Sequence, residues 1–222
     1  MTTKQKIDAL SAVFAKLTAV FAKDELHYFV ERLAQGLQEI ATVQDKLKVF
    51  EPELFKEDVV NEIRNLSKEK ETFQNRVLDS LATSEEKRSM QQLLGVSDQA
   101  MHALYRVSVE IYNERRFKEA AAAFSVIAVL DPWHFDAWMA LGNAEYFCHR
   151  YRGALIAYAM AMHCNPKNPF SHVYSAACYE KIKEYDNAIQ SLDTALFVIH
   201  ENPEYKELAL NIKEQKQRLK LI

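Results

Sequence analysis

The sequence predicts an all-α fold in which antiparallel helix pairs repeat along the chain. Gly and Pro number only 4 and 5 among 222 residues, so turns are few and the elements between them are long. Ala, Leu, Glu, Lys and Gln are abundant, and these residues favour helices. The segments RRFKEAAAAF (115–124) and HRYRGALIAY (149–158) share a pattern at a spacing of 34 residues. A fixed period of this length is typical of stacked helix pairs.

Composition and charge restrict the class of protein. The net charge is −3 and no region is strongly basic, which gives a nucleic-acid role little support. No segment approaches the roughly 20 apolar residues of a membrane span, and Lys16 interrupts the apolar N-terminal segment, unlike in a signal peptide. Cys148, Cys164 and Cys178 lack paired spacing, as reduced thiols of a cytosol do. We therefore expect a soluble cytoplasmic protein without direct membrane insertion.

Residues 1–95 form an N-terminal extension with three amphipathic helical stretches. The first covers about 3–22, the second starts near Asp24 and is broken by Pro52, and the third follows that break. Apolar residues recur in them at spacings of three and four, as narrow stripes that require a partner. The stripe residues are Ile7, Leu10, Phe14, Leu17 and Phe21, then Leu26, Val30, Leu33, Leu37, Ile40 and Leu47, then Phe55, Val59, Ile63, Leu66, Phe73, Val77 and Leu81.

Two interpretations of this extension remain open. Short connections favour a self-packed bundle of three helices. Alternatively, the stripes pair two chains in a coiled-coil-like manner or cover a second segment of a bound protein. At the end of the extension, TSEE (83–86) has the form of a capping box and predicts a short helix. Gly95 followed by Ser97 predicts a helix stop and a new N-cap.

The region 96–203 contains three units of the repeat, at about 101–134, 135–168 and 169–202. A 34-residue unit with small residues at fixed places and a proline near its end is the signature of the tetratricopeptide repeat. We therefore predict three such repeats in a right-handed superhelix. The recurring residues are Phe117, Tyr151 and Tyr185, the alanines Ala120, Ala154 and Ala188, and the prolines Pro132 and Pro166, which end second helices.

The middle unit fits this pattern best. Its segment WMALGNAEYF (138–147) supplies Trp138, Leu141 and Gly142 at the places that the repeat requires. The third unit is degenerate, and Pro203 lies three residues past its expected place. His172, Ser175 and Ala176 replace the Trp, Leu and Gly there.

The first helices of tetratricopeptide repeats line a concave face, which gives the candidate peptide-binding groove. Most of its positions are apolar or aromatic, whereas capture of a C-terminal carboxylate needs Lys, Arg and Asn as donors. The lining favours an extended apolar peptide. An alternative remains for each aromatic, which is that it belongs to the core between helices. The groove positions are His102, Tyr105, Arg106, Val109 and Tyr112 in the first unit, Met139, Ala140, Asn143, Tyr146 and Phe147 in the second, and Phe170, Val173, Tyr174 and Ala177 in the third.

Residues 204–222 predict a C-terminal helix that covers the last repeat. Leu208, Ile212 and Leu219 share one face of a helix at about 204–220, and lysines occupy the rest. Terminal units of a repeat array require such a polar cap.

The sequence carries no catalytic or cofactor motif. It has no glycine-rich phosphate loop, no H-E-x-x-H and no serine elbow. Cys148 with His149 and His163 with Cys164 raise the question of a zinc site. The repeat register places the two pairs at opposite ends of a helix, roughly 20 Å apart, which is too far for one metal ion. We therefore expect no enzyme, no cofactor and no metal.

The segment 112–189 resembles the SycD/LcrH-type class II chaperones of bacterial type III secretion. The likeness is closest at VLDPWHFDAWMALGNAEY, at the basic-aromatic-x-x-Ala helix starts and at PFSHVYSAACY, and it covers the chain from near Ser97 to Ile199. The resemblance implies three tetratricopeptide repeats whose groove takes an extended, proline-containing segment of a hydrophobic translocator protein. The implied groove residues are Tyr105, Val109, Tyr112, Met139, Tyr146, Phe170 and Tyr174.

The resemblance therefore predicts a bacterial cytoplasmic chaperone that keeps translocator proteins soluble before export. It also implies a homodimer, to which the family's short lead-in helix often contributes, whereas here about 95 residues precede the first repeat. The alternative is a general adaptor or scaffold that docks the peptide of a soluble partner through the same groove.

Overall fold

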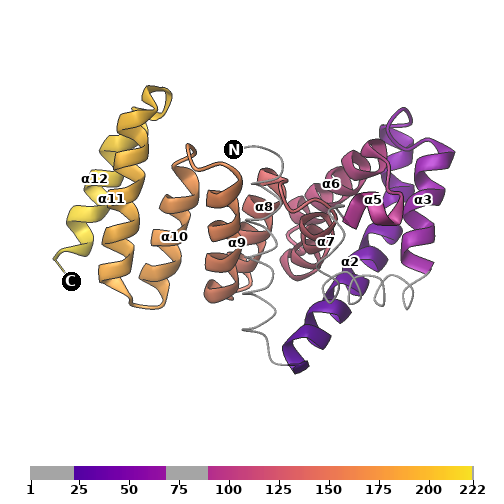
Figure 1. The fold of residues 1–222 in the computed structure, drawn as a ribbon, viewed down its shortest axis with the longest axis horizontal. Helices are drawn as coiled ribbons and strands as arrows, with labels where there is room; N and C mark the ends of the chain where they lie inside the picture. The colour runs from indigo at the N-terminus through magenta and orange to yellow at the C-terminus, as the bar shows by residue number, and fades with distance from the viewer. Residues whose placement is uncertain (1–22, 69–89, 222) are drawn as a thin grey trace. The chain divides into compact units, whose positions relative to one another are not determined.

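The computed structural model describes residues 23–68 and 90–221. The expected helix at 3–22, the capping box at 83–86 and the end of the third stretch beyond 68 lie outside the described residues. All the elements of the described part are helices, which confirms the all-α fold. They are α2 (Lys23–Phe50), α3 (Glu57–Lys68), α5 (Met90–Leu94), α6 (Asp98–Asn113), α7 (Phe117–Leu130), α8 (Phe135–Phe147), α9 (Tyr151–Cys164), α10 (Phe170–Lys181), α11 (Tyr185–Glu201), the 3-10 helix η1 (Pro203–Tyr205) and α12 (Leu208–Leu219) (Figure 1).

The chain divides into two compact units, of which one ends at Pro132 and the other begins at Trp133. The sequence places its first boundary at 95/96 instead, between the extension and the repeats. The boundary moves because α2 and α3 pack directly on α6 and α7. The described part of the extension therefore shares a core with the first helix pair, and it does not form a bundle of its own.

In the first unit, α7 lies between α6 and α2 and is buried along most of its length. The four consecutive alanines 120–123 are all buried, as are the residues from Phe124 to Leu130. Small side chains let neighbouring backbones approach closely. Gly36 of α2 meets this surface at Ala122, where a Cβ on Gly36 would lie 2.2 Å from the Ala122 carbonyl oxygen.

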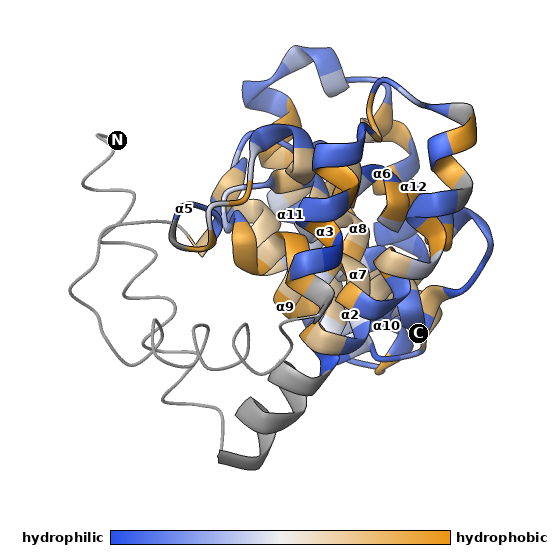
Figure 2. Ribbon diagram, turned by 90° about the vertical axis from the view of Figure 1, so that its right-hand side faces the viewer, coloured by the Kyte–Doolittle hydropathy of each residue, from blue (hydrophilic) through white to orange (hydrophobic). Residues whose placement is uncertain are grey.

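Helix α3 is amphipathic and turns its apolar side to the core of the first unit. Val59, Val60 and Ile63 are buried, while Asp58 and Asn61 are exposed. Hydrophilic and hydrophobic residues alternate along this helix (Figure 2). This stripe matches the expected one, and its partners are α2 and α6.

The start of α6 confirms the expected stop and N-cap. Gly95 adopts a left-handed φ of 67°, and the Ser97 hydroxyl accepts a hydrogen bond from the Ala100 amide at 3.1 Å. Glu62 of α3 completes the cap, because its carboxylate accepts bonds from the Ser97 backbone N–H at 2.5 Å and from the Ser97 hydroxyl at 2.8 Å. The capping carboxylate comes from another helix, in contrast to the usual capping box.

In the second unit, α8 pairs with α9 and α10 pairs with α11, and α9 packs on α10 (Figure 1). Helices α7 and α9 each end two residues before a proline, Pro132 and Pro166, as expected. Helix α11 has 17 residues whereas α9 has 14. The extra three residues account for the displaced Pro203.

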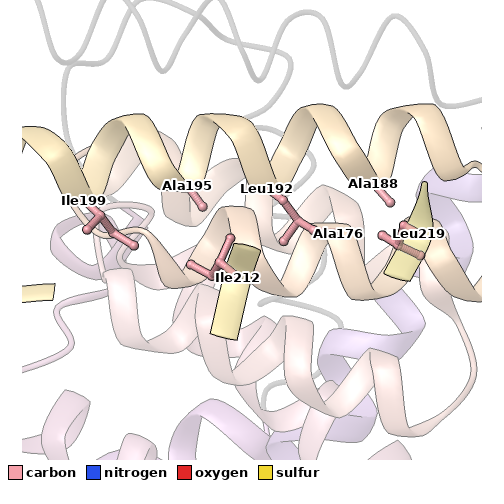
Figure 3. Close-up of a cluster of buried hydrophobic side chains, with 7 residues drawn as sticks. All are labelled: Ala176, Ala188, Leu192, Ala195, Ile199, Ile212 and Leu219. Atoms are coloured by element: carbon pink, nitrogen blue, oxygen red, sulfur yellow. The ribbon is translucent and has the colours of Figure 1, made fainter. Parts of the chain in front are cut away.

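Helix α12 covers the apolar side of α11 at the C-terminal end of the second unit. Ile212 and Leu219 are buried against Leu192 and neighbouring small residues of α10 and α11 (Figure 3). Leu208, the third residue of the expected stripe, packs at the edge of this cluster. Lys216 of α12 forms an ion pair with Asp193.

A left-handed residue connects the two helices of each pair. Arg115, His149 and Lys183 have φ values of 61°, 59° and 63° and lie 34 residues apart. In the middle pair the His149 N–H bonds to the Tyr146 carbonyl at 2.9 Å, and the Arg150 N–H bonds to the Glu145 carbonyl at 3.0 Å. This pattern is a Schellman motif, and the sequence analysis did not find it because none of the three residues is glycine.

Candidate functional site

The nine residues predicted to line the groove all lie on the first helices of the pairs. Each is partly buried, so each side chain has one side against the protein and another side accessible. Three lie in the first unit, on α6, and six lie in the second unit, on α8 and α10. They are Tyr105, Val109 and Tyr112, then Met139, Asn143 and Tyr146, then Phe170, Val173 and Tyr174.

On α6, Tyr105, Val109 and Tyr112 follow each other at helical spacing and share one face. The ring of Tyr105 lies 5.9 Å from that of Phe124, and the ring of Tyr112 lies 5.2 Å from that of Phe117 and 6.5 Å from that of Phe124. These edge and tilted contacts fix the orientation of both rings. The core interpretation of these aromatics is thus partly right, because α7 takes one side of each ring.

Arg106 lies beside this face and is already neutralised. Its Nε donates to Glu51 at 2.6 Å, and its Nη1 lies 3.5 Å from Glu110. A peptide carboxylate would have to displace these partners. The geometry of the first unit therefore favours an apolar ligand over an acidic one.

On α8, Met139, Asn143 and Tyr146 form the corresponding face. Ser171 of α10 donates to the Met139 sulfur at 3.2 Å, which fixes the thioether between the two first helices. The ring of Tyr146 lies 5.4 Å from that of Tyr151, and burial raises the pKa of the Tyr146 phenol. Tyr146 therefore keeps its proton and remains a hydrogen-bond donor.

Asn143 is the one polar side chain among the nine candidates. The buried Tyr158 of α9 donates its hydroxyl to the Asn143 Oδ1 at 2.7 Å. The sequence analysis singled out Tyr158 only as a repeat aromatic. Its spacing of 34 from Phe124 showed that it is a core residue, and its bond to the groove face could not be read from that spacing.

On α10, Phe170 and Tyr174 extend an aromatic row. The Tyr158 and Tyr174 rings lie 5.7 Å apart, and the Phe170 and Tyr174 rings lie 6.0 Å apart. Tyr205 of η1 adds an edge contact to Phe170 at 6.0 Å. Sequence reasoning missed Tyr205 because it lies outside the repeats. Val173 packs against the cluster under α11 and α12, so it contributes more to the core than its neighbours do.

The described part of the chain offers little ionisable chemistry. No group of three or more His, Cys, Asp or Glu residues there is placed to hold a metal ion. Cys178 is buried, and burial raises the pKa of its thiol to about 12, so it is a poor nucleophile near neutral pH. Among the described helices, none is long and apolar enough to cross a bilayer.

The stacked helix pairs, with aromatic first helices that stay partly exposed, define a tetratricopeptide-type binding protein. Among curated proteins, the chain is 24% identical over 126 residues to low calcium response locus protein H of Yersinia pseudotuberculosis serotype I (strain IP32953) and 23% identical to that of Yersinia pestis. Each match covers 57% of this chain and 75% of the relative. No family model matches the sequence.

Solved structures show the same fold. The type III secretion translocator chaperone SycD of Yersinia enterocolitica superposes with a TM-score of 0.53 at 24% identity, over 57% of this chain and 87% of SycD. PcrH in complex with the chaperone-binding region of PopD gives a TM-score of 0.54 at 19% identity, over 57% of this chain and 96% of PcrH. These findings confirm the resemblance to SycD/LcrH-type chaperones and the tetratricopeptide-type fold.

Proposed function

We propose that this protein is a non-enzymatic, cytoplasmic bacterial chaperone of type III secretion translocators. It binds an extended apolar segment of a hydrophobic translocator on the first helices of its repeats and keeps this cargo soluble before export. The relatives support the proposal. SycD has been crystallised with a peptide of the translocator YopD, and PcrH with the chaperone-binding regions of PopD and PopB.

The observation that carries the proposal is the chemistry of the nine candidate residues. Eight of them are apolar or aromatic, and all nine are partly exposed. A membrane-inserting cargo aggregates when its apolar segments meet water. Burying one aromatic of the site contributes about 2 kcal/mol, so several together give binding after the cost of ordering the peptide.

Co-expression with a hydrophobic translocator from the same cell tests the proposal. A chaperone keeps a translocator soluble that precipitates when it is expressed alone, and the complex is recovered by affinity purification. The adaptor alternative predicts a partner that is soluble without this protein. A translocator that remains insoluble in the presence of the chain contradicts the chaperone function.

Titration with peptides tests the site itself. The panel consists of the bound segment of that translocator, mapped by its protection from protease, together with the YopD, PopD and PopB segments. Replacing Tyr105, Tyr112 and Tyr174 together by Ala should weaken binding at least a hundredfold while helicity is retained. The matched control is Phe197→Ala, which removes an exposed aromatic from the second helix α11. Equal loss in both variants would contradict the assignment of the site.

A homodimer is part of the same proposal, since SycD has been crystallised as a dimer. The described extension already uses the apolar faces of α2 and α3 to cover α6 and α7. Mass measurement by light scattering of the full chain, with and without cargo, gives the oligomeric state. A monomer at all concentrations would remove this part of the proposal and leave the chaperone function standing.

A further inference from the structure

The geometry points to Asn143 as the residue that sets the register of the bound peptide, with Tyr158 as the positioning residue that fixes its amide. Asn143 presents its Nδ2 to a backbone carbonyl of an extended apolar peptide, while Tyr158 holds the amide oxygen from beneath. This inference rests on the proposed function and deepens it.

The first step is the direction of the amide. The Tyr158 hydroxyl, 2.7 Å from the Asn143 Oδ1, donates to that oxygen and so turns the amide nitrogen away from α9. Within the described part of the chain, Nδ2 has no hydrogen-bond partner, and it is not among the sealed polar atoms. It therefore offers two N–H donors on the face that Asn143 shares with Met139 and Tyr146.

The second step is the packing that carries the hydroxyl to this place. Tyr158 is 1% exposed, so its ring lies within the core. The ring can pass under α8 only because residue 142 is glycine, since a Cβ there would lie 2.4 Å from the Tyr158 Cε1. Gly142, Tyr158 and the adjacent Asn143 thus form one device, in which the glycine makes room and the phenol emerges at the amide.

The third step compares the three repeats. Steps of 34 residues place Phe124 and Leu192 at the position of Tyr158, and Val109 and Ala177 at that of Asn143. Phenylalanine fills the core position in the first repeat, so packing alone does not require the hydroxyl. The hydroxyl and the amide occur together, and only in the middle repeat.

A single donor among apolar neighbours has a specific use. Apolar pockets accept an extended chain in several registers, because the peptide pattern repeats every second residue. One buried polar group selects the register in which its hydrogen bond is made, as a single Asn does in a coiled coil. The ligand class is therefore an extended apolar peptide with an unpaired backbone carbonyl opposite Asn143.

Three variants test the inference with the peptide panel defined above. Asn143→Asp keeps the acceptor for Tyr158 and removes the donor, and it should weaken binding about fivefold to tenfold. Tyr158→Phe keeps the ring and removes the hydroxyl, and it should weaken binding by a similar factor. Tyr185→Phe, a hydroxyl deletion at the start of α11, is the matched control and should leave affinity unchanged.

A double-mutant cycle separates positioning from a general loss of structure. If Tyr158 acts through Asn143, then Tyr158→Phe has no further effect on affinity in an Asn143→Ala background, although both proteins lose the same hydroxyl. Without peptide, the Asn143 side-chain amide signals in an NMR spectrum should shift in Tyr158→Phe and stay in place in Tyr185→Phe.

The outcomes distinguish the two proposals. If the wild type binds a panel peptide and Asn143→Asp binds it equally well, the register inference is wrong and the chaperone function stands. If the effects of Tyr158→Phe and Asn143→Ala are fully additive, Tyr158 does not act through Asn143, and its assigned role is overturned. If the wild type binds none of the peptides and keeps no cargo soluble, the proposed function is wrong and the inference falls with it.

Discussion

Gly36 and Ala122 mark the closest approach of α2 to α7. A Cβ on Gly36 would lie 2.2 Å from the Ala122 carbonyl oxygen and 2.5 Å from its carbonyl carbon. Because both of these atoms belong to the backbone, no side-chain rotation relieves the clash. The N-terminal extension is therefore docked on the first helix pair at a place where only glycine fits.

Substituting Gly36 tests this docking. Gly36→Val forces α2 away from α7 and should lower the free energy of unfolding of the first unit by at least 1–3 kcal/mol, the usual cost of overpacking a core. Hydrogen exchange followed by mass spectrometry should show faster exchange in α2 and α7, with α10 and α11 unchanged. The control is Gln35→Val, which places the same side chain on the exposed neighbour. Equal destabilisation by the two variants would contradict the close approach.

Gln44 is a costly residue in the same helix. It is fully buried, and neither its amide nitrogen nor its amide oxygen has a hydrogen-bond partner. A buried polar group without a partner costs about 1–3 kcal/mol. Gln44→Met, which has nearly the same shape, should therefore raise the midpoint of chemical unfolding of the first unit by a corresponding amount. Gln38→Met, at an exposed site of α2, should change it little. A less stable Gln44→Met protein would show that the amide makes a bond the structure lacks.

The residues 97–201 illustrate what the sequence could predict. The 34-residue period predicted the helix pairs, the prolines after α7 and α9, and the added length of α11, because these features follow from local sequence. The partner of the extension could not be predicted in this way. An amphipathic stripe such as Val59, Val60 and Ile63 states that a face is buried, but not which helix covers it. Gly36 is informative only once α7 lies opposite.

The candidate site shows the same division. Repeat register placed all nine candidates on first helices, and each is partly exposed, but whether they bind peptide remains a prediction. Tyr205 and the bond from Tyr158 to Asn143 depend on which side chains meet across helices. Periodicity assigns a position to a face and does not give its contacts.

The left-handed residues of the helix connections offer a stabilising substitution. Lys183 has a φ of 63°, which costs a residue with a Cβ about 1 kcal/mol relative to glycine. Lys183→Gly should therefore raise the free energy of unfolding of the second unit by about 0.5–1 kcal/mol, after the greater entropy of glycine in the unfolded chain is subtracted. Lys181→Gly, two residues earlier within α10, should lower it instead. Thermal unfolding of both variants gives the comparison, and a destabilised Lys183→Gly would contradict the argument.

The burial of His172 predicts how stability depends on pH. Burial lowers the pKa of this imidazole below its ordinary value of 6.5, so the native state resists a proton that the unfolded chain accepts. The free energy of unfolding should therefore fall as the pH decreases from 7.5 to 5.5. The ion pair with Lys48 lowers the pKa of Glu57 from 4.5, so loss of its contribution begins at more acidic pH. His172→Gln should flatten the profile between pH 7.5 and 5.5, measured by urea unfolding, whereas His200→Gln, at an exposed site, should not. An unchanged slope in His172→Gln would show that another group carries the dependence.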